Sequence, residues 1–96
     1  MRRERAAEAL ARDESAEVRS VAAYALAATS TDITKKKDVK ILLETLQDEF
    51  EDAAVRGAAY DALLILHRKP DFPTKRRCFN PEADVDWNWV QSLTIR

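Results

Sequence analysis

Two stretches of the chain, 37 residues apart, are near copies of each other. The stretch "AEVRSVAAYALA" (16–27) returns as "AAVRGAAYDALL" (53–64). Six positions are identical: Ala16/Ala53, Val18/Val55, Arg19/Arg56, Ala22/Ala59, Ala25/Ala62 and Leu26/Leu63. Both copies place apolar residues three and four positions apart, which is the spacing of an amphipathic helix. A repeat of this length is typical of folds in which similar helical units stack side by side.

The segments around the two copies predict further helices. Strong helix formers fill 2–12, and helices are expected at 16–29, 38–50 and 53–67. In the second helix the predicted apolar stripe is Val18, Val21, Ala22, Ala25, Leu26 and Thr29. In the third helix Asp38 is expected to cap the start, and the predicted stripe is Val39, Leu42, Leu43, Leu46 and Phe50.

The fourth helix is apolar on more than one side. Its main stripe is Val55, Ala58, Ala59, Ala62, Leu63 and Leu66, and Leu64 and Ile65 lie off that stripe. A helix that is apolar on two sides is normally covered on two sides. We therefore expect another element to pack on the C-terminal half of this helix.

The C-terminal tail fits both a helix and a strand. Asn80 and Pro81 are typical of the N-cap and first turn of a helix at about 81–93. In 84–95, however, the apolar residues fall two apart or at multiples of two, as in a strand: Val85, Trp87, Trp89, Leu93 and Ile95. A lone strand would have no partner, so we favour the helix. Trp87 and Trp89 are expected to cap the fourth helix, with a role as partner-binding anchors as the alternative.

These segments predict one all-α domain (1–96) of about five helices. One glycine, abundant alanine and 34% charged residues favour helices over a β-sandwich. We divide the domain into repeat 1 (1–29), repeat 2 (38–67) and a loop with a capping segment (68–96). Antiparallel hairpins that cannot bury their stripes alone would stack into an α-solenoid. Because a solenoid usually needs three or more repeats, the tail, a homodimer or a longer solenoid must cover the open ends.

The repeats resemble a known family. "ALARDESAEVRSVAAYALA" (9–27) resembles a HEAT repeat of the short, HEAT-like type, and "LLETLQDEFEDAAVRGAAYDALLIL" (42–66) resembles a second copy. The resemblance covers roughly 6–66 and implies a right-handed α-solenoid. It also implies a ladder of Arg and Asp between repeats, which we carry over only to Asp13, Arg19 and Arg56. The second copy departs from the pattern, since Phe50, between Glu49 and Glu51, stands where the Asp would be.

No catalytic, cofactor-binding or metal-binding residues are expected. The only histidine, His67, lies in the last turn of a predicted helix. A partly charged imidazole at that end interacts favourably with the helix dipole. The lone Cys78 follows Lys75, Arg76 and Arg77 and is expected to be an ordinary loop or packed cysteine. The acidic residues of 48–52 indicate a solvated turn, with a docking patch for a basic partner as the alternative.

The predicted function is a non-enzymatic scaffold or adaptor that binds another protein. Tyr24 and Tyr60 would face the concave side of the solenoid, although both could instead be wedged between repeats. One alternative is a lyase- or chaperone-type accessory subunit that acts on a cofactor-bearing protein, which rests on analogy alone. Another alternative is nucleic-acid binding through the basic segment 67–79. The local excess of positive charge is small, which disfavours this alternative.

The compartment follows from what the chain lacks. The single cysteine allows no internal disulfide, which fits a reducing compartment. The sequence has no signal peptide and no apolar run long enough to span a bilayer. The formal net charge of −1 gives no overall attraction to an anionic membrane. We therefore expect a cytoplasmic protein that does not bind membranes.

Overall fold

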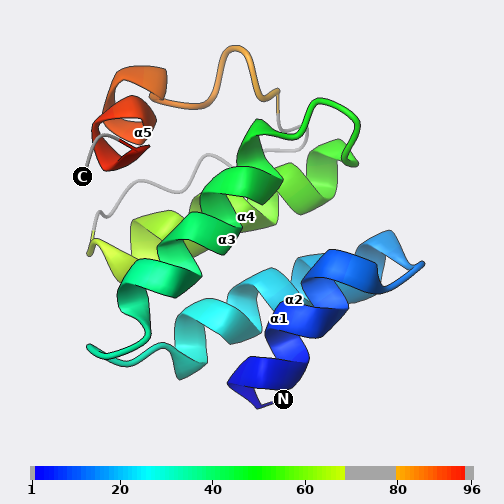
Figure 1. Cartoon of the computed structure of the whole chain (residues 1–96). Coiled ribbons are helices and arrows are strands. Elements are labelled where there is room, and N and C mark those ends of the chain that lie inside the picture. Colours follow the sequence, from blue (N-terminus) through cyan, green and yellow to red (C-terminus); the bar gives the residue numbers. More distant parts are fainter. Residues whose placement is uncertain (1, 69–79, 95–96) are drawn as a thin grey trace.

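The computed structural model describes residues 2–68 and 80–94, and all regular structure in these ranges is helical (Figure 1). The elements in chain order are α1 (Arg3–Arg12), α2 (Ala16–Thr29), α3 (Lys35–Gln47), α4 (Ala53–Leu66) and α5 (Trp87–Thr94). The prediction of an all-α chain with about five helices is confirmed for these residues. Cys78 and most of the basic segment 67–79 lie outside them.

The first four helices form two hairpins, α1 with α2 and α3 with α4 (Figure 1). The two helices that carry the repeated sequence, α2 and α4, lie side by side and run in the same direction. The Tyr24 hydroxyl on α2 donates to Asp61 Oδ2 on α4 at 2.7 Å. These two residues are 37 positions apart, so equivalent positions of the two copies face each other. α5 lies on the far side of the second hairpin from the first, against α3 and α4.

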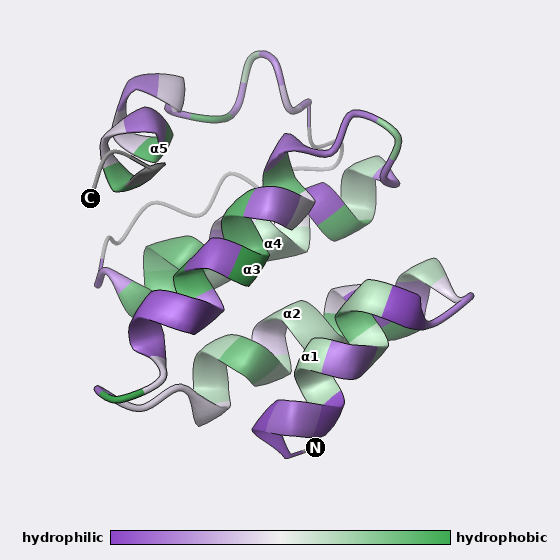
Figure 2. Ribbon diagram, viewed as in Figure 1, coloured by the Kyte–Doolittle hydropathy of each residue, from purple (hydrophilic) through white to green (hydrophobic). Residues whose placement is uncertain are grey.

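The helix α4 is the most deeply buried element. Nine of its 14 residues are buried, and its ribbon is hydrophobic along most of its length (Figure 2). It packs against α2 and α3, and Trp89 of α5 covers Tyr60 and His67 near its end. Leu64 is buried, as expected of a covered residue, in the same hydrophobic core that contains Val90 and Leu93 of α5. The same expectation is wrong for Ile65, which remains exposed.

The buried face of α2 differs from the predicted stripe. Val21 is 59% exposed, and the buried residues of this helix are Ala22, Ala23, Leu26 and Ala27. The helix is turned so that its smallest side chains meet α1 and α4. Alanine at these positions lets neighbouring helices approach closely, whereas a ridge of larger residues would hold them apart.

The helix α3 begins and ends three residues earlier than predicted. The threonines of the α2–α3 connector form a turn in which the Lys35 N–H donates to the Thr31 carbonyl oxygen at 2.8 Å. The lysines that follow are good helix formers and extend this turn into α3. At the other end the Asp48 carboxylate accepts the Phe50 N–H at 2.9 Å, which bends the chain out of the helix. Phe50 is consequently 99% exposed and is not part of the apolar stripe.

The tail is helical, as favoured over a strand, but α5 begins later than predicted. The Asn80 side chain caps a single turn by accepting the Glu82 N–H at 3.0 Å. A new start follows at Asp86, whose Oδ1 accepts the Trp89 N–H at 3.1 Å. Asp86 thus acts as the N-cap of α5, because its side chain satisfies one of the free N–H groups of the first turn.

Candidate functional site

Arg19 joins the two hairpins. Its Nε and Nη2 donate to the two carboxylate oxygens of Glu51 at 3.0 and 2.8 Å, and its Nη1 donates to the Asp13 carbonyl oxygen at 2.7 Å. Arg19 lies in the first turn of α2, and Glu51 lies in the turn before α4, so the contact crosses between hairpins. The hydrogen bonds that the Arg19 guanidinium donates to the Glu51 carboxylate raise the pKa of Arg19. We call this contact the Glu51 joint.

Asp13 and Arg56, the other two residues assigned to the ladder, make contacts within their own hairpins. The Asp13 carboxylate accepts the Ser15 N–H at 2.8 Å, and only its backbone carbonyl meets Arg19. Arg56 Nε donates to the Leu46 carbonyl oxygen at the end of α3, at 2.7 Å. The carboxylate of the inter-hairpin bridge belongs to Glu51, which the sequence marked only as an acidic neighbour of the position equivalent to Asp13.

A second ion pair between the hairpins was missed from the sequence. Arg3 Nε donates to Asp38 Oδ1 at 2.7 Å, and Ser30 Oγ donates to Asp38 Oδ2 at the same distance. Asp38 lies inside the first turn of α3 with 0% exposure, so its prediction as a helix cap is wrong. The spacing of Asp38, Leu42 and Leu46, four residues apart on one helix face, was the signal that could have placed this carboxylate in the core. We call this contact the Asp38 joint.

Hydrogen bonds determine the ionisation of Asp38. Burial opposes the charged form and would raise the pKa of the carboxyl group. Hydrogen bonds from Arg3, Ser30 and Thr34 outweigh this effect and lower the pKa of Asp38 below its ordinary value. The carboxylate is therefore held ionised in the core, with its charge balanced by Arg3.

The aromatic residues of the C-terminal half pack internally. Tyr60 is only 4% exposed, and its hydroxyl accepts the Asp86 N–H at 3.1 Å. The Trp89 ring packs edge-on against Tyr60 and His67, with ring centroids 6.1 and 5.4 Å apart. The Trp87 indole N–H donates to the Pro81 carbonyl oxygen at 2.9 Å. The expected place of Tyr60 on a binding surface is thus corrected, because its ring is enclosed between α4 and the tail.

His67 ends α4. One of its ring nitrogens, Nδ1, lies 2.9 Å from the Leu63 carbonyl oxygen, one of the last acceptors of the helix. The next residue, Arg68, has a φ of 55°, the left-handed conformation that commonly terminates helices. With Trp89 against its ring, His67 has a structural position that fits its predicted place in the last turn.

Tyr24 lies on an outward face of α2. It is 41% exposed, and Val21 and Ala28 project from the same face one turn before and one turn after it. On α4, Ile65 lies one turn beyond Asp61, which accepts the Tyr24 hydroxyl bond. We call Val21, Tyr24, Ala28 and Ile65 the α2 face. It combines an aromatic ring held by a hydrogen bond with exposed aliphatic side chains.

Within 2–68 and 80–94, no group of three or more His, Cys, Asp or Glu side chains is placed to hold a metal ion. No helix in these ranges has the length and hydrophobicity that crossing a membrane requires. No family model, no curated protein and no solved structure matches the chain.

Proposed function

We propose that this chain is a HEAT-like α-solenoid segment that binds another protein and catalyses no reaction. Three features support the repeat: the two sequence copies, the parallel packing of α2 and α4, and the contact between equivalent positions through Tyr24 and Asp61. In a solenoid, neighbouring repeats contact each other in one register, and the helices on one side form an extended surface for a partner.

The observation that carries the binding proposal is the exposure of the α2 face. Tyr24 offers a large, amphipathic contact area, and its bond to Asp61 reduces the side-chain entropy that binding would cost. Val21 extends this area with an exposed aliphatic side chain. Burial of this side chain in the fold does not explain its presence, so it is available to a partner. Aromatic residues with few rotatable bonds, surrounded by aliphatic ones, are common anchors in protein interfaces.

In this proposal the C-terminal tryptophans cover the end of the second repeat and do not bind the partner. Trp89 stabilises the end of the second repeat through its contacts with Tyr60 and His67, as a terminal cap does in repeat proteins. The partner surface is therefore assigned to α2. We propose a cytoplasmic location, since one cysteine suits a reducing compartment.

Affinity capture from the native cell tests the α2 face. Wild-type chain is compared with Val21→Lys and Tyr24→Ala, and with Ile33→Lys as the control. Ile33 is an exposed aliphatic residue of the α2–α3 connector, so this control makes the same kind of change on another surface. We expect a partner that wild type and the control retain and both α2-face variants lose. Circular dichroism verifies that all four chains keep the same helix content.

Retention of every captured protein by Val21→Lys and Tyr24→Ala would remove the α2 face as the binding surface. Light scattering on the pure chain then gives the oligomeric state, because a homodimer could use the same face. A dimer that Val21→Lys dissociates would identify the partner as a second copy of this chain.

A further inference from the structure

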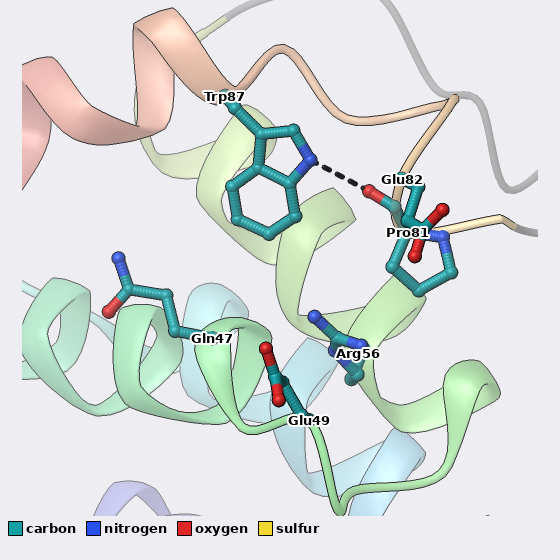
Figure 3. Close-up of a pocket in the computed structure, with 6 residues that line it drawn as sticks. All are labelled: Gln47, Glu49, Arg56, Pro81, Glu82 and Trp87. Carbon is teal, nitrogen blue, oxygen red and sulfur yellow. Dashed lines mark hydrogen bonds between the residues drawn. The ribbon is translucent and has the colours of Figure 1, made fainter.

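A pocket opens between the α3–α4 turn of the second hairpin and the residues that lead into α5. It has a volume of about 560 Å³ and is lined by Gln47, Glu49, Arg56, Pro81, Glu82 and Trp87 (Figure 3). Three separate segments build it: the end of α3 with the turn that follows, the first turns of α4, and the residues leading into α5. Pockets of this size accommodate one long side chain with its neighbouring backbone.

The pocket holds one guanidinium and two carboxylates. Arg56 Nε is engaged by the Leu46 carbonyl oxygen, and the end of its side chain points toward the pocket (Figure 3). Glu49 and Glu82 are exposed, and neither carboxylate forms an ion pair with another of the described residues. Two carboxylates and one guanidinium leave an excess of one negative charge in the lining.

This charge pattern selects among ligand classes. A simple anion would suit Arg56 but would face both carboxylates, and a bare cation would suit the carboxylates but would face Arg56. A peptide segment with a basic side chain supplies both kinds of group. Its backbone carbonyl oxygens can accept from Arg56, and its ammonium or guanidinium group can pair with Glu49 and Glu82.

The surroundings of the pocket favour the same ligand. Phe50 follows Glu49 in the turn and is almost completely exposed, so it can contact an apolar residue of the same peptide. The aromatic ring of Trp87 forms one wall and can pack along the aliphatic stem of a lysine or arginine. Asp48 and Asp52 add negative charge on either side of this turn.

We propose that this pocket binds a basic side chain, arginine or lysine, in an extended segment of a partner protein, with an adjacent apolar residue on Phe50. The proposal shares with the function proposed above only the premise that the ligand is a protein. The site is built on the second hairpin and the tail, whereas the α2 face is built mainly on the first hairpin. The two can therefore fail independently.

Two matched peptides test the proposal on the pure chain. Both are acetylated and amidated, with the sequence Gly-Leu-X-Leu-Gly, where X is arginine in one and glutamine in the other. Binding is followed by NMR through the Trp87 indole N–H, which reports directly on the pocket wall. We expect saturable shifts with the arginine peptide, weakened by added salt, and none with the glutamine peptide.

Charge-neutral variants locate the contact. Glu49→Gln and Glu82→Gln should each weaken binding of the arginine peptide roughly threefold to tenfold, the range of a partly exposed charge-assisted contact. Glu8→Gln removes the same charge from the exposed side of α1 and should leave the affinity unchanged. Val21→Lys and Tyr24→Ala should also leave peptide binding unchanged, which separates this site from the α2 face.

Four results would overturn the proposal. They are the absence of a saturable shift at Trp87, equal binding of the two peptides, equal weakening by Glu8→Gln, and binding of free arginine as tight as that of the peptide. The third result would indicate only a general attraction to the net charge of the chain. The last would make the pocket a site for a small zwitterion instead of a protein segment.

Discussion

The two joints between the hairpins are built from the same chemistry in different surroundings. Each pairs an arginine of the first hairpin with a carboxylate of the second, at opposite ends of α2. In the Asp38 joint the carboxylate is fully buried and also accepts a hydrogen bond from Ser30. In the Glu51 joint both side chains keep some contact with water. Burial therefore decides how much stability is lost when one partner of each pair is removed.

The Asp38 joint should produce the largest effect when it is broken. Asp38→Asn removes the charge that balances Arg3 and leaves a partly buried guanidinium without its counter-ion. We expect a loss of about 2–3 kcal/mol in the free energy of unfolding, because removing one partner of a buried pair leaves an uncompensated charge. Urea denaturation measures it. Asp32→Asn, an exposed aspartate in the α2–α3 connector, is the matched control and should change stability by less than about 0.5 kcal/mol.

The Asp38→Asn variant also tests a predicted pH dependence of stability. The pKa of Asp38 is lower in the folded chain than in the unfolded chain, where it is about 3.9. Ionised Asp38 therefore stabilises the fold fully above that unfolded value, and this contribution disappears as the pH falls through the folded value. The difference between wild type and Asp38→Asn should shrink between pH 5 and pH 2. A difference that stays constant over this range would show that the variant acts through packing and not through charge.

The Glu51 joint should have a smaller effect that reveals coupling across the hairpins. Arg19→Ala should lower the melting temperature by roughly 5–10 °C, since it removes the paired bonds to Glu51 and the bond to the Asp13 carbonyl. In a double-mutant cycle with Glu51→Ala, the double variant should lose less stability than the two single variants added together. Full additivity of the two losses would mean that the contact between Arg19 and Glu51 contributes nothing. Arg5→Ala, on the exposed side of α1, is the control for the loss of an arginine.

The repeat explains which parts of the fold the sequence could predict. The bounds of α2 and the start of α4 were correct, because caps at Ser15 and Asp52 and a helical period specify them locally. The early start of α3 was missed because a capping aspartate and a buried, paired aspartate look alike without their partner. Arg3, that partner, is 35 positions away and lies outside both sequence copies. Contacts repeated in both hairpins leave a pattern in the sequence, whereas contacts made once do not.

The orientation of the candidate binding residues was harder to predict than the helices themselves. Tyr24 and Tyr60 both lie on helices with the same sequence pattern, yet only Tyr24 reaches the surface. The two tyrosines do not occupy equivalent positions: Tyr60 is equivalent to Ala23, which is also buried, and Tyr24 is equivalent to Asp61. The offset of one residue turns the two rings toward different sides of their helices, so the shared pattern does not place both on one surface.

Arg56→Ala should give the smallest effect of the series and sharpens the comparison of the joints. Arg56 occupies the position equivalent to Arg19, but its hydrogen bond goes to the Leu46 carbonyl oxygen within its own hairpin. Losing this one bond should lower the melting temperature by roughly 3–6 °C without unfolding the chain. Differential scanning calorimetry on both variants gives the order. A larger loss for Arg56→Ala than for Arg19→Ala would mean that closing the α3–α4 turn stabilises the fold more than bridging the two hairpins. An unchanged melting temperature would show that Arg56 is only a surface charge.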